Sequence, residues 1–258
     1  MGFLQVLTAS PPGDADRRGR AGERPRDTSE RTEMAAGNQQ PGEIARLPGE
    51  TPTGAKARES AGQTTGRRGP ALVLASQSPY RLQLLREAGY EVRASPAHID
   101  EPDPTTLGDL RSGLIHIAQR KARTVLERGA SGLILAADTV GHAQGKVFGK
   151  PADRADARRM LEAISGVAHE VLTGWCLLRS RDGLLVSGCE ATQIVMRSWT
   201  DAEFEAYLDS GEWEGKCGAY GLQWPGDPFV TRLEGSAANV VGVPLERLAA
   251  VLAEFALG

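Results

Sequence analysis

The stretch ALVLASQSPYRLQLL, residues 71–85, contains the first strand and the first helix that the sequence predicts. Its opening run, 71–76, is short and apolar, as is typical of a buried strand. Ser78 then suits a helix cap and Pro79 suits the first helical turn, while Gly89 favours an end to the helix. A strand that leads directly into a capped helix is the first sign of an α/β fold.

Further strands and helices follow as far as residue 255. Apolar or alternating runs predict strands at 90–95, 133–137, 170–178, 184–196, 218–223 and 229–233. Amphipathic runs predict helices at 107–128, 155–164, 200–208 and 245–255. Because these elements mix without strict alternation, we expect an α/β class with a mixed twisted sheet and flanking helices.

The first 69 residues differ in composition from the rest of the chain. They hold 11 Gly, 6 Pro, 11 Lys or Arg and 9 Asp or Glu, and Phe3 is their only aromatic residue. Such a segment buries too little apolar surface to offset the entropy lost on ordering. We therefore predict a disordered polar leader over 1–69 and one globular domain over 70–258.

Charge, targeting signals and cysteines exclude several classes of protein. The net charge of −3 among 258 residues divides into a basic leader and an acidic body, which argues against an obligate nucleic-acid or membrane-surface binder. No run approaches the roughly 18 apolar residues of a membrane span, and no secretory signal fits, so we expect a cytoplasmic protein. Cys176, Cys189 and Cys217 form no CxxC pair, which indicates free thiols rather than disulfides or a zinc site.

Polar residues beside the predicted strand and helix ends are candidates for chemistry. Ser76, Ser78 and Arg81 lie at a helix N-terminus, where unpaired N–H groups and the helix dipole favour an anion. Asp138 follows the apolar strand 133–137, and Lys150 follows a predicted hairpin at Gly145. Each cluster also has a simpler reading: a cap without a ligand, an aspartate that closes a turn, and a solvated lysine.

Three further residues are weaker candidates. Gln223 ends the glycine-containing run 218–223 and carries both donor and acceptor groups, as base recognition requires. Glu101 lies in an acidic, proline-rich loop, and Lys121 lies within an apolar-faced helix. A P-loop, a GxGxxG turn and a GxSxG elbow are absent, which disfavours P-loop nucleotidases, Rossmann dehydrogenases and α/β-hydrolases.

Taken in order, these clusters resemble one known family. The series is LASQSPYRLQLL, IDEP, AQRKA, AADTV, GKP, SGVAHEVLTG, GKCGAYGLQ and GSAANVVGVPLERL, between about residues 71 and 255. It is similar to the Maf family of nucleotide pyrophosphatases, also called septum formation proteins. The resemblance implies an elongated, two-lobed α/β fold like that of the inosine-triphosphate pyrophosphatases, with a central cleft and often a homodimer.

The resemblance also implies a reaction and a set of roles. The reaction is hydrolysis of a nucleoside triphosphate to the monophosphate and pyrophosphate with a divalent metal, which we expect to be Mg²⁺ or Mn²⁺. The charge balance favours neither a nucleic-acid nor a membrane partner. Asp138 would accept the proton of the attacking water, and Glu101 would join it in holding the metal. The other expected site residues are the phosphate-binding Arg81, Lys121 and Lys150, the anion-site Ser76 and Ser78, and the specificity residues Tyr80, Thr139 and Gln223.

Elementary chemistry agrees with that reading. Phosphoryl transfer requires positioning and neutralisation of charge more than covalent help from the protein. Mg²⁺ prefers one or two carboxylates plus substrate phosphates, and the few histidines and cysteines near these motifs do not suit zinc. A metal-bound water has a lowered pKa, so a nearby carboxylate is well suited to accept its proton.

The sequence departs from the family pattern at one substrate-binding position. The branch that acts on dTTP and UTP usually carries SPRR, whereas this chain has SPYR with Tyr80. An aromatic residue there resembles the branch that acts on 7-methyl-GTP, yet ADTV and GAYGLQ resemble the first branch. We expect dTTP or UTP as substrate, with 7-methyl-GTP as the alternative. A non-catalytic, nucleotide-binding regulator of septum formation is the alternative from another class.

Overall fold

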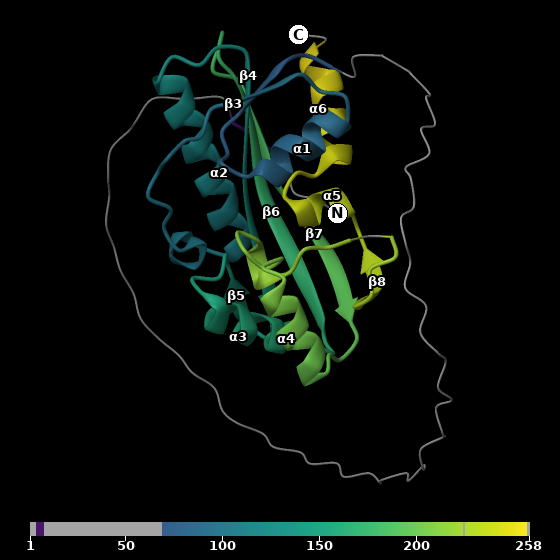
Figure 1. The fold of residues 1–258 in the computed structure, drawn as a ribbon. Helices are drawn as coiled ribbons and strands as arrows, with labels where there is room; N and C mark the ends of the chain where they lie inside the picture. Colours follow the sequence, from purple (N-terminus) through teal and green to yellow (C-terminus); the bar gives the residue numbers. More distant parts are fainter. Residues whose placement is uncertain (1–3, 8–68, 224, 257–258) are drawn as a thin grey trace, which may run out of the picture. The chain divides into compact units, whose positions relative to one another are not determined.

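A mixed eight-stranded sheet forms the centre of the described chain (Figure 1). The computed structural model describes residues 4–7, 69–223 and 225–256. The strand order is β1-β7-β6-β4-β2-β3, and β5 and β8 pair with β4 and β7. This confirms the predicted α/β class with a mixed sheet. The strands are β1 Leu4–Leu7, β2 Leu72–Leu74, β3 Val92–Ala94, β4 Leu133–Ala143, β5 Lys146–Phe148, β6 Ala168–Arg179, β7 Leu185–Met196 and β8 Val230–Glu234.

Most helices begin where the sequence predicts a cap. Ser78 caps the first helix with Pro79 in its first turn, and Thr200 forms a reciprocal capping box with Glu203. The long helix begins at Leu110 rather than 107, because Asp109 caps it and a short 3₁₀ turn precedes it. The helices are α1 Pro79–Glu87, α2 Leu110–Glu127, α3 Arg154–Ile164, α4 Asp201–Asp209, α5 Ala237–Val241 and α6 Leu245–Ala256, with 3₁₀ turns η1 Pro104–Leu107 and η2 Cys217–Ala219.

Alternation along β4 assigns its residues to two opposite layers. Leu135 and Ala137 pack in the layer that α1 and α6 cover. Ile134 and Ala136 pack in the layer that α2 covers (Figure 1). Because successive strand residues point to opposite faces, Asp138 belongs to the α2 side.

A second core fills the end of the sheet that α3 and α4 cover. Its centre is a group of rings around Trp199, which stacks on Phe229 with the ring centroids 3.7 Å apart. Tyr207 and Tyr220 meet the same indole edge-on and stack on each other. Tyr220 of this group also lines one of the two cavities described below.

Besides the start of α2, four features of the structure differ from what the sequence led us to expect. β4 does not end at residue 137 but continues to Ala143, because ten consecutive residues pair with β6 and satisfy its backbone. Residues 218–223 are not a strand: Gly218 and Ala219 adopt positive φ values of 68° and 60°, which extended pairing does not allow. The helix α5 was not predicted, since its five residues are too few to show a period.

The fourth difference concerns the predicted leader. Leu4–Leu7, expected to be disordered, pairs antiparallel with Leu185–Gly188 as β1. The free edge of β7 offers backbone donors and acceptors, so a short segment gains pairing there without a periodic sequence. Residues 1–3 and 8–68 lie outside the described residues, so the rest of that prediction stays a prediction. Among the described helices, none combines the length and apolar character needed to cross a membrane.

Candidate active site

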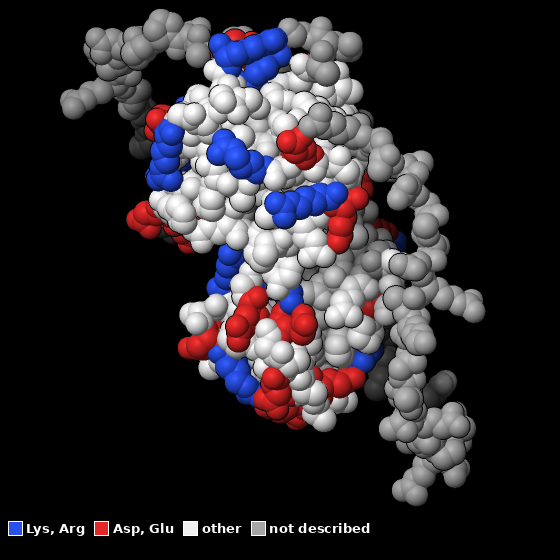
Figure 2. Space-filling model, turned by 45° about the horizontal axis from the view of Figure 1, so that its top comes forward, with Lys and Arg blue, Asp and Glu red and all other residues white. Residues whose placement is uncertain are grey.

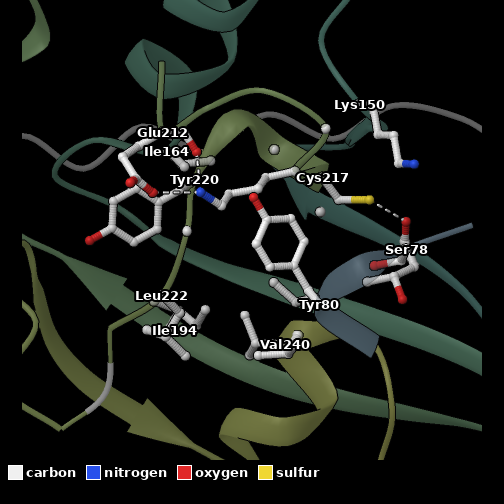
Figure 3. Close-up of a pocket in the computed structure, with 18 of the residues that line it drawn as sticks. Ser78, Tyr80, Lys150, Ile164, Ile194, Glu212, Cys217, Tyr220, Leu222 and Val240 are labelled. Atoms are coloured by element: carbon white, nitrogen blue, oxygen red, sulfur yellow. Dashed lines mark hydrogen bonds and ion pairs between the residues drawn. The ribbon is translucent and has the colours of Figure 1, made fainter. Parts of the chain in front are cut away.

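Two adjoining cavities lie beside the middle of β4. The larger measures about 440 Å³, and we name it the carboxylate cavity because Glu101, Asp103 and Asp138 line it. The smaller measures about 270 Å³, and we name it the apolar cavity after Ile164, Ile194, Leu222 and Val240 (Figure 3). The residues that line both cavities are Ser78, Arg81, Thr139, Lys150 and Cys217.

A lysine between two carboxylates is the central feature of the carboxylate cavity. Lys121 Nζ lies 2.7 Å from Asp138 Oδ1 and 2.9 Å from Glu101 Oε1. The Lys121 and Asp138 side chains are 8% and 14% exposed, so pairing and hydrogen bonding offset the cost of burying both charges. Two carboxylates around one ammonium group leave a local negative charge, which favours a cation.

The close approach of α2 to the sheet makes this contact geometrically feasible. Asp138 pairs across the sheet with Gly174 on β6. A Cβ at Gly174 would collide with the backbone of Leu114 in α2. The glycine therefore permits the helix to lie directly on the sheet, and Lys121, two turns further along α2, meets the carboxylate.

Arg81 extends from α1 to the other face of β4. Its Nη1 donates to Ser76 Oγ at 3.1 Å and to the Ala137 carbonyl at 3.0 Å, and its Nη2 donates to Thr139 Oγ1 at 2.7 Å. All three acceptors are neutral, so they orient the guanidinium without cancelling its charge. Arg81 Nε is buried and has no hydrogen-bond partner among the described residues.

Lys150 supplies a second cationic group at the same place. Figure 3 shows it near Ser78 and Cys217, at the end of the apolar cavity that joins the carboxylate cavity. Lys150 makes no hydrogen bond or ion pair with another described residue. The Gly218 amide donates to the Gly149 carbonyl at 2.9 Å, which ties the loop before Lys150 to η2.

Cys217 lies where the two cavities meet. Its Sγ donates to the Thr139 carbonyl at 2.8 Å (Figure 3). Burial raises the pKa of this thiol, which favours the protonated donor. The structure thus assigns Cys217 a contact with β4, although the sequence suggested no role for it. All three cysteines are free, as predicted.

Tyr80 stands between the charged end and the apolar end of the smaller cavity (Figure 3). Its side chain is 41% exposed, and Lys216 Nζ lies 5.2 Å from the centre of its ring. Lys216 also donates to the Glu212 carbonyl and to Glu212 Oε2, the latter at 2.7 Å. An exposed ring beside apolar side chains offers a flat surface for an aromatic ligand.

The ten residues proposed from the sequence all line one or both cavities. Tyr80 and Gln223 line the apolar cavity, Ser78, Arg81, Thr139 and Lys150 line both cavities, and the other four line the carboxylate cavity. Sequence reasoning did not identify Glu212 and Lys216, which also line the apolar cavity. Lys216 lies within the GKCGAYGLQ motif, which was the one signal for it. His169 also lines the apolar cavity; its ring is buried, and desolvation lowers its pKa, which favours the neutral imidazole.

Two carboxylates and neighbouring oxygen donors fit a hard divalent cation. Within the described residues no group of three or more His, Cys, Asp or Glu side chains is arranged to enclose a metal. Glu101 and Asp138 alone suit Mg²⁺ or Mn²⁺, which commonly take one or two protein carboxylates and complete their coordination with substrate phosphates and water. The residues present therefore fit the predicted metal and do not suit zinc.

The fold and the cleft define an α/β protein with adjoining sites for a charged group and an apolar group. Comparison with known proteins makes this specific: the model of the Maf-like protein family matches residues 71–255. The chain belongs to this family, which confirms the resemblance seen in the sequence.

The matches with three curated relatives cover between 82% and 99% of the length of each relative. The chain is 42% identical over 191 residues to a protein of Bdellovibrio bacteriovorus named dTTP/UTP pyrophosphatase, covering 72% of this chain and 99% of that protein. It is 38% identical over 175 residues to a dTTP/UTP pyrophosphatase of Pyrococcus horikoshii, covering 68% and 91%. A Rhodopirellula baltica protein of the same name is 41% identical over 186 residues, covering 72% and 82%.

Proposed function

We propose that this chain is a nucleoside triphosphate pyrophosphatase that converts dTTP or UTP to the monophosphate and pyrophosphate. The observation that carries the proposal is the meeting of Glu101, Asp138 and Lys121 in one cavity, beside Lys150. The names of its relatives support the same substrates. In the proposed complex the triphosphate occupies the carboxylate cavity and the base occupies the apolar cavity.

The proposed reaction breaks the bond between the α- and β-phosphates. The oxygen of a water molecule bonds to the α-phosphorus, and one proton of that water passes to the Asp138 carboxylate. Lys121, 2.7 Å from Asp138 Oδ1, holds that carboxylate in place and balances its charge. Pyrophosphate then leaves, and the nucleoside monophosphate carries the new P–O bond.

The remaining residues bind and orient the substrate. Lys150 reaches the phosphates as an otherwise unpaired cation, and the Arg81 guanidinium adds charge from the opposite face of β4. Ser76 and Ser78 present their hydroxyls at the start of α1. A divalent cation held by Glu101 and Asp138 would neutralise phosphate charge and lower the pKa of bound water.

The experiment is a panel of nucleoside triphosphates with Mg²⁺ or Mn²⁺ and direct detection of pyrophosphate. We expect turnover of dTTP and UTP, its loss with EDTA, and a fall in kcat of about 10²- to 10⁴-fold in Asp138→Asn. Asp182→Asn is the matched control, because its carboxylate closes the β6–β7 turn and lines neither cavity. Wild-type turnover by Asp138→Asn, or no turnover by the wild type, rejects the proposal.

Tyr80 favours a second substrate within the same reaction. An exposed ring stands where the dTTP and UTP branch usually has arginine, and it is able to stack on a large modified purine. The alternative substrate is 7-methyl-GTP. A kcat/KM for 7-methyl-GTP above that for dTTP in the same panel selects this alternative.

We further propose that the enzyme acts in the cytoplasm as a homodimer without nucleic-acid or membrane partners. On the face in Figure 2, basic and acidic side chains are interspersed, which does not favour a polyanion. Light scattering of the purified chain tests the dimer. Salt-dependent binding to DNA, RNA or vesicles would contradict the proposed absence of nucleic-acid and membrane partners.

A further inference from the structure

The apolar cavity has one wall without regular secondary structure. Tyr220, Gly221, Leu222 and Gln223 line it, and Figure 3 shows Tyr220 and Leu222 facing the enclosed space. These residues come after η2 and before β8, so no strand ladder or helix fixes their backbone. Side-chain hydrogen bonds have to hold a segment of this kind in one conformation.

A single buried carboxylate supplies most of those hydrogen bonds. Asp227 Oδ1 accepts from the Tyr220 hydroxyl at 2.5 Å and from the Phe229 and Val230 amides at 2.9 and 3.0 Å. Asp227 Oδ2 accepts from the Gln223 amide at 2.9 Å. Both oxygens are used, and the carboxylate joins the start of the wall to the start of β8.

The donor from Tyr220 is secure at neutral pH. Burial raises the pKa of the Tyr220 phenol, and the hydrogen bond to the Asp227 carboxylate raises it further. The phenol therefore stays protonated and donates. Tyr207 supports the same segment from the other side, because its hydroxyl accepts from the Gly221 amide at 2.9 Å.

Asp227 does not contact the ligand directly in the proposed complex. It is buried, and it is not among the described residues that line either cavity, whereas Tyr220 and Gln223 line the apolar cavity. We propose that Asp227 is a positioning residue for base recognition, which fixes Tyr220 and Gln223 against the nucleobase. This inference rests on the proposed function, in which the apolar cavity receives the base.

Asp227→Asn in the full chain tests the inference. The asparagine keeps the size of the side chain but replaces one acceptor oxygen with an NH₂ donor, which opposes the phenol or the amides that now donate to it. We expect KM for dTTP to rise about tenfold while kcat stays within about twofold, because Asp227 accepts hydrogen bonds from Tyr220, Gln223, Phe229 and Val230 and from none of the proposed phosphate-binding residues. The preference for dTTP over dCTP should fall as well.

A second readout follows the wall itself. Hydrogen–deuterium exchange over residues 220–230 should quicken in Asp227→Asn and stay unchanged in Asp182→Asn, whose carboxylate also closes a turn but lies away from both cavities. Tyr220→Phe keeps the ring and removes one of the four donors. It should therefore give a smaller rise in KM, in the same direction.

The outcomes separate a positioning role from a purely structural one. A lower melting temperature of Asp227→Asn with wild-type KM and base preference overturns the inference, and so does unchanged exchange over 220–230. A wild type that hydrolyses no nucleotide rejects the proposed function instead. In that case exchange still decides whether Asp227 anchors the wall.

Discussion

Two neighbouring residues of β4 serve the two sides of the sheet. Asp138 points toward α2 and meets Lys121, whereas Thr139 points to the other side and meets Arg81. Strand alternation alone produces this division, since consecutive side chains face opposite ways. The proposed proton acceptor and the contact to α1 are thus fixed relative to each other by one rigid strand.

Gly242 is the residue whose substitution should most selectively disturb the position of the Arg81 side chain. A Cβ there would lie 2.5 Å from Arg81 Nε, and the backbone has a φ of +111°. Gly242→Ala should lower the free energy of unfolding by roughly 1–3 kcal/mol and should raise KM, because the guanidinium has to shift. Urea unfolding and steady-state kinetics measure both effects.

Gly129→Ala is the control for Gly242→Ala. Gly129 also has a positive φ, of +88°, but a Cβ there meets nothing within 4 Å. Gly129→Ala should therefore lower the free energy of unfolding through backbone strain without any change in KM. If Gly242→Ala and Gly129→Ala have the same KM, Arg81 does not depend on Gly242.

Single residues were predictable where the signal is local. Ser78 and Pro79 mark the start of α1 because a cap and a first turn involve only adjacent residues. The hydrogen bonds of Asp227 were not predictable. Three of its four donors, Tyr220, Gln223 and Phe229, lie between η2 and β8, where the sequence pattern does not reveal the shape of the backbone. The Lys121–Asp138 pair was visible only as two separate candidates, because tertiary packing brings them together.

At the scale of elements, continuous pairing overrode the sequence signal for the end of β4. The apolar run stops at Ala137, so the sequence places Asp138 after the strand. The structure keeps it within the strand, paired with Gly174. The polar side chain is accommodated because α2 supplies Lys121, and no local pattern reports a partner 17 residues away.

The N-terminus of α4 gives a prediction that depends on pH. Hydrogen bonds from Arg197, then from the Thr200 amide, lower the Glu203 pKa from 4.5 to about 2. A lowered folded-state pKa stabilises the protein above the unfolded value and loses that effect as pH falls toward 2. Glu203→Gln should therefore have a lower urea midpoint than the wild type at pH 7.

The difference between these midpoints should shrink between about pH 4.5 and pH 2, the interval that the two Glu203 pKa values define. Glu214→Gln removes the same charge from the turn that follows α4, where the carboxylate makes no hydrogen bond or ion pair with another described residue, and should have a urea midpoint close to that of the wild type at pH 7. A midpoint difference for Glu203→Gln that is constant from pH 7 to pH 2 would contradict the assignment.

At the scale of the whole molecule, the candidate site lies entirely within the body of the chain. Every residue proposed to contact the substrate or metal falls between Ser76 and Gln223, the positioning residue Asp227 follows shortly after, and the family match covers 71–255. The Bdellovibrio relative is matched over 99% of its length by 72% of this chain. We therefore expect the chemistry to reside in residues 70–258 alone.

A chain that begins at Gly69 tests this expectation. Its kcat/KM for dTTP should stay within about twofold of the full-length value, because no proposed contact is removed. Loss of the β1–β7 pairing should lower its melting temperature, measured by calorimetry. A kcat/KM more than about tenfold below that of the full chain, in a protein that remains folded, would assign the leader a part in catalysis.

The division of the cleft between phosphates and base is the central claim, and a crystal structure with an α,β-non-hydrolysable dTTP analogue and Mg²⁺ tests it most directly. The account predicts the triphosphate in the carboxylate cavity, with Mg²⁺ on Glu101 and Asp138, Lys150 on the phosphates, and thymine in the apolar cavity between Tyr80 and Gln223. A nucleotide bound the opposite way round, or outside both cavities, would contradict it.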